Sequence, residues 1–173
     1  MLKGKNMNLS VCIITKNEKE NLEKCLQALA GYDLEIVVAD TGSTDGTLEM
    51  IRNYTGSVYE FTWCDDFAKA RNFAISKAVN DRILVLDSDE YVQKMDIKQI
   101  QSCFEQFPEG IGKIRIKNYF YQKNEIQEEV EYINRLFDRR YYQYEGKIHE
   151  QLVRKDGESI QTYQAPVLID HSG

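Results

Sequence analysis

The chain has 173 residues, of which 42% are hydrophobic and 29% charged, and only 2 are prolines. This balance is typical of one folded domain with a real core, and it excludes a low-complexity chain. The formal net charge of -6 argues against a nucleic-acid-binding protein, because such proteins present a basic face to phosphate. No apolar run approaches the roughly 20 residues of a membrane-spanning helix.

The cysteines show neither zinc-site spacing nor a preceding signal peptide, so we expect no disulfide framework. There are four of them: Cys12, Cys25, Cys64 and Cys103. We expect reduced, structural thiols in a cytoplasmic protein. Residues 1–7 are expected to be a disordered leader, and residues 8–173 to form a single domain.

Buried strands alternate with helices through the first half of the chain. Runs of apolar and β-branched residues predict strands at 9–15, 34–40 and 82–87, and a weaker strand at 57–63. Strands that alternate with helices at this spacing form a parallel sheet covered on both faces.

Three helices are predicted between these strands. The first begins at an N-cap, Asn17, with Glu20 three residues on completing a capping box, and runs to about Ala30. The turn TGSTDGT, with its two glycines, leads into the second helix over 48–54, and helical spacing of small and apolar residues places the third at 67–79.

The pattern changes in the second half of the chain. An amphipathic helix is predicted over 97–107, and four strand-like stretches follow at 113–121, 132–140, 146–153 and 160–171. The predicted fold class is therefore α/β: a Rossmann-like, mostly parallel sheet flanked by helices, with a smaller mixed or antiparallel C-terminal part.

The stretch LVLDSDEYV, residues 84–92, begins as a buried strand and then becomes acidic at Asp87, Asp89 and Glu90. Clustered carboxylates repel one another, so stability gives no reason for them. Oxygen ligands suit Mg²⁺ or Mn²⁺, which take one or two protein carboxylates and complete their shell with phosphate and water. The cluster is either a cation site, which its place at the end of a buried strand favours, or a solvated turn.

Polar residues follow two further strands of the predicted sheet. They lie at 15–18 and 40–45, and the acidic turn at 87–90 makes a third cluster. The carboxyl ends of parallel strands share one edge, and ligands of such sheets bind there. We expect a binding site at this edge.

Four motifs occur in the order and at the spacing of a known family. VCIITKNEKENLEKCLQAL, VVADTGSTDGT, DDFAKARNFA and LVLDSDE resemble the nucleotide-binding half of a family 2 glycosyltransferase with the GT-A fold. RLFDRR, GKIHEQL and the terminal VLIDH resemble the same family more loosely, in its bacterial lipopolysaccharide-core and peptide-glycosylating subset. The resemblance implies a nucleotide-binding half over 8–92 and an acceptor-side half over 93–173. A truncated acceptor-side half stays open as an alternative.

The resemblance assigns donor-binding roles to residues of the first half. Thr15, Asn17 and Glu18 would border the nucleotide, and Asp40 would accept a hydrogen bond from the base or ribose. Ser88 lies between the two aspartates of the acidic turn and is included in the donor site. A helix-capping turn is the alternative for Asp40.

The resemblance also implies the metal and diphosphate contacts. Arg71 would face the nucleoside diphosphate, with a surface arginine as the alternative. Asp89 would ligate Mn²⁺ or Mg²⁺, and Asp87 would touch the ribose or the waters of the metal. His171 would complete the metal shell, although a lone histidine is more often structural.

The resemblance further implies that Glu150, in IHEQ, is the general base of an inverting transfer. Asp138 is the fallback, unless it pairs with the neighbouring Arg139 or Arg140. The expected donor is a UDP-sugar, and the acceptor is an unknown glycan, lipid-linked group or peptide. Two other functions stay open: a sugar-nucleotide nucleotidyltransferase, which shares the sheet topology, and a nucleotide-binding module without turnover.

Overall fold

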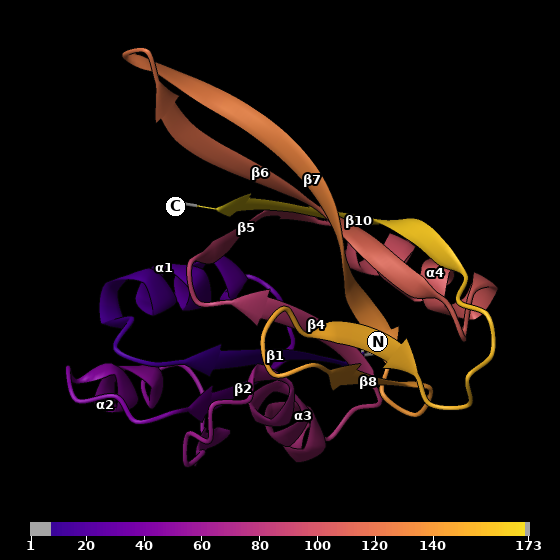
Figure 1. The fold of residues 1–173 in the computed structure, drawn as a ribbon, viewed down its shortest axis with the longest axis horizontal. Coiled ribbons are helices and arrows are strands. Elements are labelled where there is room, and N and C mark those ends of the chain that lie inside the picture. Colours follow the sequence, from indigo (N-terminus) through magenta and orange to yellow (C-terminus); the bar gives the residue numbers. More distant parts are fainter. Residues whose placement is uncertain (1–7, 172–173) are drawn as a thin grey trace, which may run out of the picture.

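The structure, a computed structural model, describes residues 8–171 and contains within them one eight-stranded sheet (Figure 1). In spatial order its strands are β3 (Val58–Glu60), β2 (Glu35–Asp40), β1 (Leu9–Thr15), β4 (Arg82–Asp87), β7 (Glu125–Asp138), β6 (Ile111–Gln122), β10 (Thr162–His171) and β5 (Glu90–Met95). A separate antiparallel hairpin joins β8 (Tyr142–Glu145) to β9 (Gln151–Arg154). The expected leader, 1–7, lies outside the described residues.

Helices pack on both faces of the sheet, as the alternating pattern predicts. The core on one face contains apolar side chains of α1 (Lys19–Leu29), α2 (Thr47–Ile51) and α4 (Ile97–Gln106). The core on the other face contains those of α3 (Phe67–Lys77) and of the β8–β9 hairpin. The predicted α/β fold class is confirmed.

The first four strands are parallel, and their registers bring their carboxyl ends level with one another. Thr15 at the end of β1 lies beside Asp40 at the end of β2, and Ile14 lies beside Asp87 at the end of β4. The three polar clusters predicted from the sequence therefore share one edge of the sheet.

Three local predictions were wrong. The strand expected over 146–153 is a loop as far as Glu150, and β9 begins only at Gln151. Asn17 does not cap α1: its φ of 51° is left-handed, and its side-chain oxygen instead accepts a hydrogen bond from the Thr44 amide. Glu18 occupies the N-cap position, without a side-chain capping bond. The acidic turn also leads directly into a strand, β5, that the charged sequence after Asp89 concealed.

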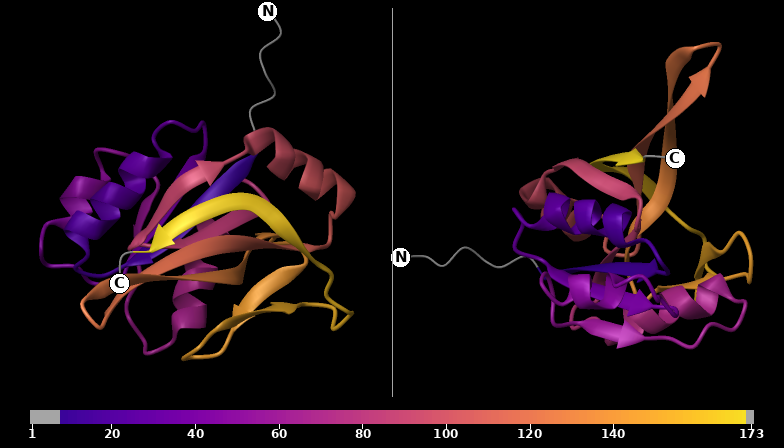
Figure 2. Two further views of the ribbon diagram at one scale, coloured as in Figure 1. Left: turned by 90° about the horizontal axis from the view of Figure 1, so that it is seen from above. Right: turned by 90° about the vertical axis from the view of Figure 1, so that its left-hand side faces the viewer.

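The second half extends the sheet rather than forming a separate layer. Strand β7 runs antiparallel to β4, β6 antiparallel to β7, and β10 parallel to β6. The distal part of the β6–β7 hairpin projects away from the body of the molecule (Figure 1 and the right view of Figure 2). Its exposed large side chains include Tyr121 and Ile126 near the tip.

The structure describes no helix of sufficient length and apolar character to cross a bilayer. The cysteines are free: Cys12 and Cys25 are buried, Cys103 is half-buried and Cys64 is exposed.

Candidate functional site

The loops after β1 and β2 are tied together at the carboxyl edge. The Asn17 amide donates to the Ser43 hydroxyl (2.8 Å), and the Thr41 hydroxyl donates to the Thr15 carbonyl (3.0 Å). Asp40 accepts hydrogen bonds from the Gly42 and Ser43 amides through Oδ2. This turn closes the loop after β2 and does not cap a helix, because α2 begins at Thr47 with Gly46 as its N-cap.

Two buried oxygens at this edge have no partner within the described residues. They are Oδ1 of Asp40 and the hydroxyl of Thr15. Since a buried polar atom without a partner is costly, unpaired oxygens at a strand edge mark places where a ligand could donate a hydrogen bond. Asp40 thus has one oxygen for its own turn and one that is free.

A groove runs along the edge as two adjoining cavities. A cavity of about 260 Å³ is lined by residues of the first two loops together with an aromatic pair: Ile14, Thr15, Lys16, Glu18, Thr41, Trp63, Phe67 and Ser88. The other cavity of the groove has a volume of about 400 Å³. It shares Ile14, Phe67 and Ser88 with the first and adds Arg71, Asp87, Asp89, Ile148, His149 and Glu150. We call the two together the donor groove, after the donor site predicted there from the sequence. Asn17 and Asp40 do not line it, whereas the other residues predicted for the donor do.

Asp87 is held by two buried guanidinium groups. Its Oδ1 accepts from Nη2 of Arg71 at 2.7 Å, and its Oδ2 accepts from Nη2 of Arg135 at 3.2 Å. Arg135 also donates to Glu90 at 3.1 Å, and Glu90 accepts from the Asp87 amide. The acidic turn is therefore compensated by cations from α3 and β7 and is not a solvated turn.

The network shifts the protonation of its members in opposite directions. Burial raises the pKa of Asp87, but the charges of Arg135 and Arg71 outweigh this and hold it well below its usual range. Burial also raises the pKa of Glu90; Arg135 opposes the rise, and Asp87 reinforces it. Asp87 is thus a fixed anion beside the donor groove.

Arg71 is buried, contrary to the alternative of a surface arginine. Its Nε donates to Oε1 of Glu150 at 2.6 Å, while its guanidinium lies over the Tyr144 ring. Its third nitrogen, Nη1, is buried and has no partner within residues 8–171.

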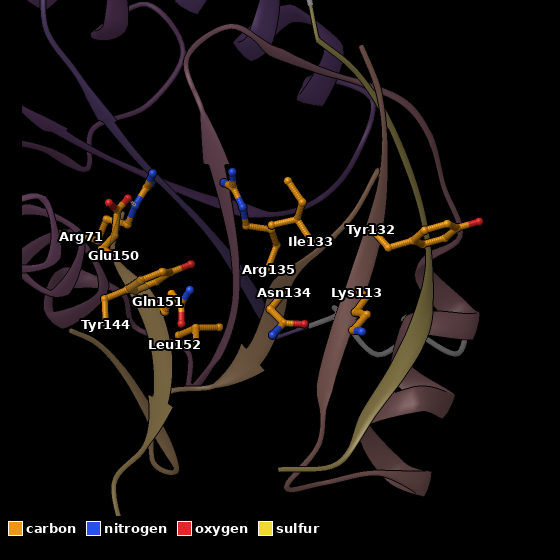
Figure 3. A pocket seen from close by; sticks show the side chains of 10 residues that line it. All are labelled: Arg71, Lys113, Tyr132, Ile133, Asn134, Arg135, Tyr144, Glu150, Gln151 and Leu152. Atoms are coloured by element: carbon orange, nitrogen blue, oxygen red, sulfur yellow. Dashed lines mark hydrogen bonds and ion pairs between the residues drawn. The ribbon is translucent and has the colours of Figure 1, made fainter. Parts of the chain in front are cut away.

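Glu150 stands between the donor groove and a second cavity. The second cavity has a volume of about 380 Å³, and Arg71 and Glu150 line both. Figure 3 shows Arg71, Glu150 and Tyr144 on one side of it, Lys113 and Tyr132 on the other, and Asn134 between them. Glu150 follows a loop with positive φ at Gly146 (104°) and His149 (56°), and Ile148 is 70% exposed at the groove.

Two of the residues predicted for the metal, Asp89 and His171, are far apart in sequence and lie together. Nε2 of His171, at the end of β10, is 2.9 Å from Oδ2 of Asp89, and its Nδ1 is 2.8 Å from Oδ1 of Asn118. A partner on the second ring nitrogen is the usual way to fix the tautomer of a ligating histidine. The described residues contain no cluster of three or more His, Cys, Asp or Glu side chains that could hold a metal ion. A cation at this pair would need its other ligands from phosphate and water.

Asp138, the fallback base, lies elsewhere. It is buried and paired with Arg140 (2.7 Å), and β7 places it beside Arg82, at the start of β4 and so at the opposite edge from Asp87. Sequence reasoning missed Arg135 altogether. Arg135 is the one charged residue in the apolar centre of the strand-like run YINRLFD. A charge at a buried strand position needs a partner, and this could have indicated an ion pair.

A family model described as glycosyl transferase family 2 matches residues 10–159. The chain belongs to this family. Its α/β architecture agrees with that of solved GT-A neighbours, which confirms the predicted family and makes the domain a glycosyltransferase domain.

Among the relatives of this glycosyltransferase is a TPR repeat-containing protein of Synechococcus elongatus, 37% identical over 104 residues, which are 60% of this chain and 26% of that protein. Another is the poly(ribitol-phosphate) beta-N-acetylglucosaminyltransferase TarS of Staphylococcus aureus, 28% identical over 121 residues, which are 64% of this chain and 21% of TarS. The glycosyltransferase thus spans about a quarter or less of these relatives.

A crystal structure of TarS with UDP-GlcNAc matches with a TM-score of 0.57 and 28% identity, over 64% of this chain and 34% of that one. A mannosyltransferase of Pyrobaculum calidifontis with GDP-Man and Mn²⁺ matches with a TM-score of 0.50 and 23% identity, over 62% and 34%, which shows likeness of fold alone.

Proposed function

We propose that this domain transfers a sugar from a UDP-sugar to an acceptor hydroxyl by a metal-dependent, inverting displacement. The observation that carries the proposal is the place of Glu150, in the wall between the donor groove and the second cavity. A carboxylate that touches both spaces can take a proton from a nucleophile in one while that nucleophile attacks a carbon in the other.

The donor would lie along the groove, with its nucleoside toward the loops after β1 and β2. There the Thr15 hydroxyl, which lines the groove, is a buried acceptor without a protein donor and suits an N–H or hydroxyl group of a nucleoside. Asp40 Oδ1 is likewise without a donor but lies outside the groove lining, so the nucleoside would reach it only by shifting the neighbouring loop. The Trp63 and Phe67 rings pack edge to face nearby, at 4.8 Å between centroids. Structures of TarS with UDP and with UDP-GlcNAc favour uridine as the base.

Asp89 and His171 would hold Mn²⁺ or Mg²⁺, with Asp87 contributing through water or the ribose. Such a cation, when bound, offsets the charge of the diphosphate and of the departing nucleoside diphosphate. Arg71 and Arg135 keep Asp87 ionised and in place. The buried Nη1 of Arg71 has no partner among residues 8–171 and would be a further donor to an oxygen atom of a bound substrate.

Glu150 would act as the base. Its Oε1 is fixed by Arg71, and its Oε2 has no hydrogen-bond partner among residues 8–171. Oε2 would accept the acceptor's hydroxyl proton as that oxygen bonds to the anomeric carbon, while the sugar–phosphate bond breaks and its electron pair leaves with the diphosphate. Attack from the face opposite the leaving group inverts the configuration.

We further propose a bacterial, cytoplasmic protein. The curated relatives named above, of Synechococcus elongatus and Staphylococcus aureus, are bacterial, and the four cysteines, including exposed Cys64, are free. Membership of the lipopolysaccharide-core and peptide-glycosylating subset stays a prediction.

Calorimetric titration of UDP and of GDP, with Mn²⁺ and then with EDTA, tests the donor site. We expect metal-dependent binding of UDP that Asp89→Ala abolishes. Asp33→Ala is the matched control, because Asp33 is exposed ahead of β2, at the far edge of the sheet. Equal UDP affinity of wild type and Asp89→Ala in Mn²⁺ would refute the metal assignment.

Release of UDP from UDP-GlcNAc, with water as acceptor, tests the base. Glu150→Gln should bind UDP normally and release it from the sugar at least about a hundredfold more slowly. An unchanged rate would remove Glu150 from the mechanism. Product analysis addresses the nucleotidyltransferase alternative, which would release pyrophosphate, and absence of turnover with intact binding would favour the module without catalysis.

A further inference from the structure

One face of the β5, β10, β6 and β7 strands is covered by no helix of the described residues, 8–171. Lys94, Leu168, Arg115 and Tyr132 are successive cross-strand partners on that face. Lys94 and Arg115 are exposed, and Tyr132 is 48% exposed. In the left view of Figure 2, no helix lies in front of β10.

This face concentrates positive charge in an acidic protein. Alternate residues of β6, Lys113, Arg115 and Lys117, point to it because successive strand residues face opposite ways. Among residues 8–171, no carboxylate forms an ion pair with Lys113 or Arg115, whereas Lys117 pairs with Glu128 at 3.4 Å. Lys94 on β5 is likewise free of ion pairs within the described chain.

Two carboxylates also lie close to this face and limit its charge. Asp96 lines the same hollow as Lys94 and Arg115, and Asp170 is the register partner of Lys117. Asp96 accepts from the Gln99 amide as the cap of α4 and keeps its negative charge. Lys94, Arg115 and Lys113 still outnumber it in this hollow and the adjoining cavity.

The basic face leads to Glu150. A hollow of about 290 Å³ contains Lys94 and Arg115, and it shares Tyr132 with the 380 Å³ cavity that contains Lys113 and Glu150. Between them the cavity holds Asn134, whose Oδ1 is buried without a partner in the described chain. A chain laid across the face would thus pass Arg115, Tyr132 and Lys113 before it reached the base.

We infer that the acceptor is an anionic glycan or polyol chain, bearing phosphate or carboxylate groups, that binds across this face. The inference rests on the proposed function, since it takes Glu150 as the point where the acceptor reacts. Arg115 and Lys113 hold the anions, and Asn134 receives a hydroxyl next to the reacting one. Lys113 and Arg115 are two positions apart on β6 and face the same way. Such a spacing suits a chain with repeated negative charges rather than one isolated anion.

An anionic membrane surface fits this face less well. Beyond Lys117 the same face of the hairpin carries Glu128, the register partner of Tyr119, which such a surface would repel. The positive charge lies in the concave part next to the cavity, where a flat bilayer does not reach.

The test measures the affinity of the whole chain for four probes, at low and at high salt, with no UDP-sugar present. The probes are a ribitol-phosphate oligomer, an oligogalacturonate, uncharged maltohexaose, and vesicles containing phosphatidylglycerol. We expect one or both anionic oligomers to bind, more weakly at high salt, and maltohexaose not to bind. The two oligomers distinguish phosphate from carboxylate.

Lys113→Ala/Arg115→Ala should weaken oligomer binding about tenfold or more. Lys24→Ala/Lys98→Ala is the matched control: it removes the same charge from exposed positions of α1 and α4, and it should bind as wild type does. Equal loss in both variants, binding of maltohexaose as tight as that of the oligomers, or binding of vesicles alone would overturn the inference. UDP titration of each variant separates this result from the donor proposal, because UDP affinity should not change.

Discussion

Replacing Arg135 by methionine tests whether the buried charge network stabilises the fold. The guanidinium donates to Glu90 (3.1 Å), Asp87 (3.2 Å) and the Val85 carbonyl (3.4 Å). Methionine keeps much of the side-chain volume but leaves Glu90, whose side chain is 5% exposed, without its cation. Removing one partner of a buried pair costs about 3–5 kcal/mol.

The lower end of that range applies here, because Asp87 keeps Arg71 and its side chain is 36% exposed. A loss of about 3 kcal/mol is a large part of the roughly 5–15 kcal/mol that stabilises a domain. At an m-value of about 2 kcal/mol/M, the midpoint of urea unfolding should fall by about 1.5 M.

A second substitution shows whether the stranded charge is the cause. Glu90→Gln in the Arg135→Met background should recover at least about 1 kcal/mol, since the uncompensated carboxylate is gone. Lys117→Met, which breaks an exposed pair on the hairpin, should cost less than about 1 kcal/mol. A cost of under 1 kcal/mol for Arg135→Met, or no recovery in the double variant, would refute the reasoning.

Two further predictions concern the core. Gly112→Ala should destabilise the fold by roughly 1–3 kcal/mol, because the new Cβ would lie 3.0 Å from Leu136 Cβ and 3.1 Å from Ala165 Cβ; Gly31→Ala, with open space around it, should melt as wild type does. Burial raises the pKa of Cys25 to about 12, so a thiol reagent should label exposed Cys64 in the native protein and Cys25 only after unfolding. Mass spectrometry of labelled peptides measures this, and equally fast labelling of Cys25 would contradict it.

The parallel half of the fold was predictable because its strands are continuous apolar runs, such as LSVCIIT and RILVLD, that need no long-range information. The strand after Asp89 was not, because EYVQKM mixes charge with apolar residues and is completed by pairing with β10, more than 70 positions away. Asn17 was misread because a helix cap and a loop-to-loop hydrogen bond use the same side-chain oxygen.

The candidate site likewise contains residues whose position could be predicted from the sequence and residues whose position could not. Sequence position placed Asp87, Ser88 and Asp89 at the correct edge, and the structure brings His171 within 2.9 Å of Asp89. The pairing of Arg71 with Glu150 depends on the path of the loop after β8, which is set by packing and by two residues of positive φ. Nothing local in the sequence specifies such a path.

The sheet continues without a break from the donor side to the acceptor side, so the halves have no hinge between them. Strand β4 is hydrogen-bonded to β7, and Arg135 of β7 reaches Asp87 at the end of β4. Glu150 directly precedes β9, in the separate β8–β9 hairpin, and is tied to this sheet through Arg71, which pairs with both Glu150 and Asp87. We expect substrates to enter and leave by displacement of the short segment 146–149, so that turnover needs loop motion and not the closure of two lobes.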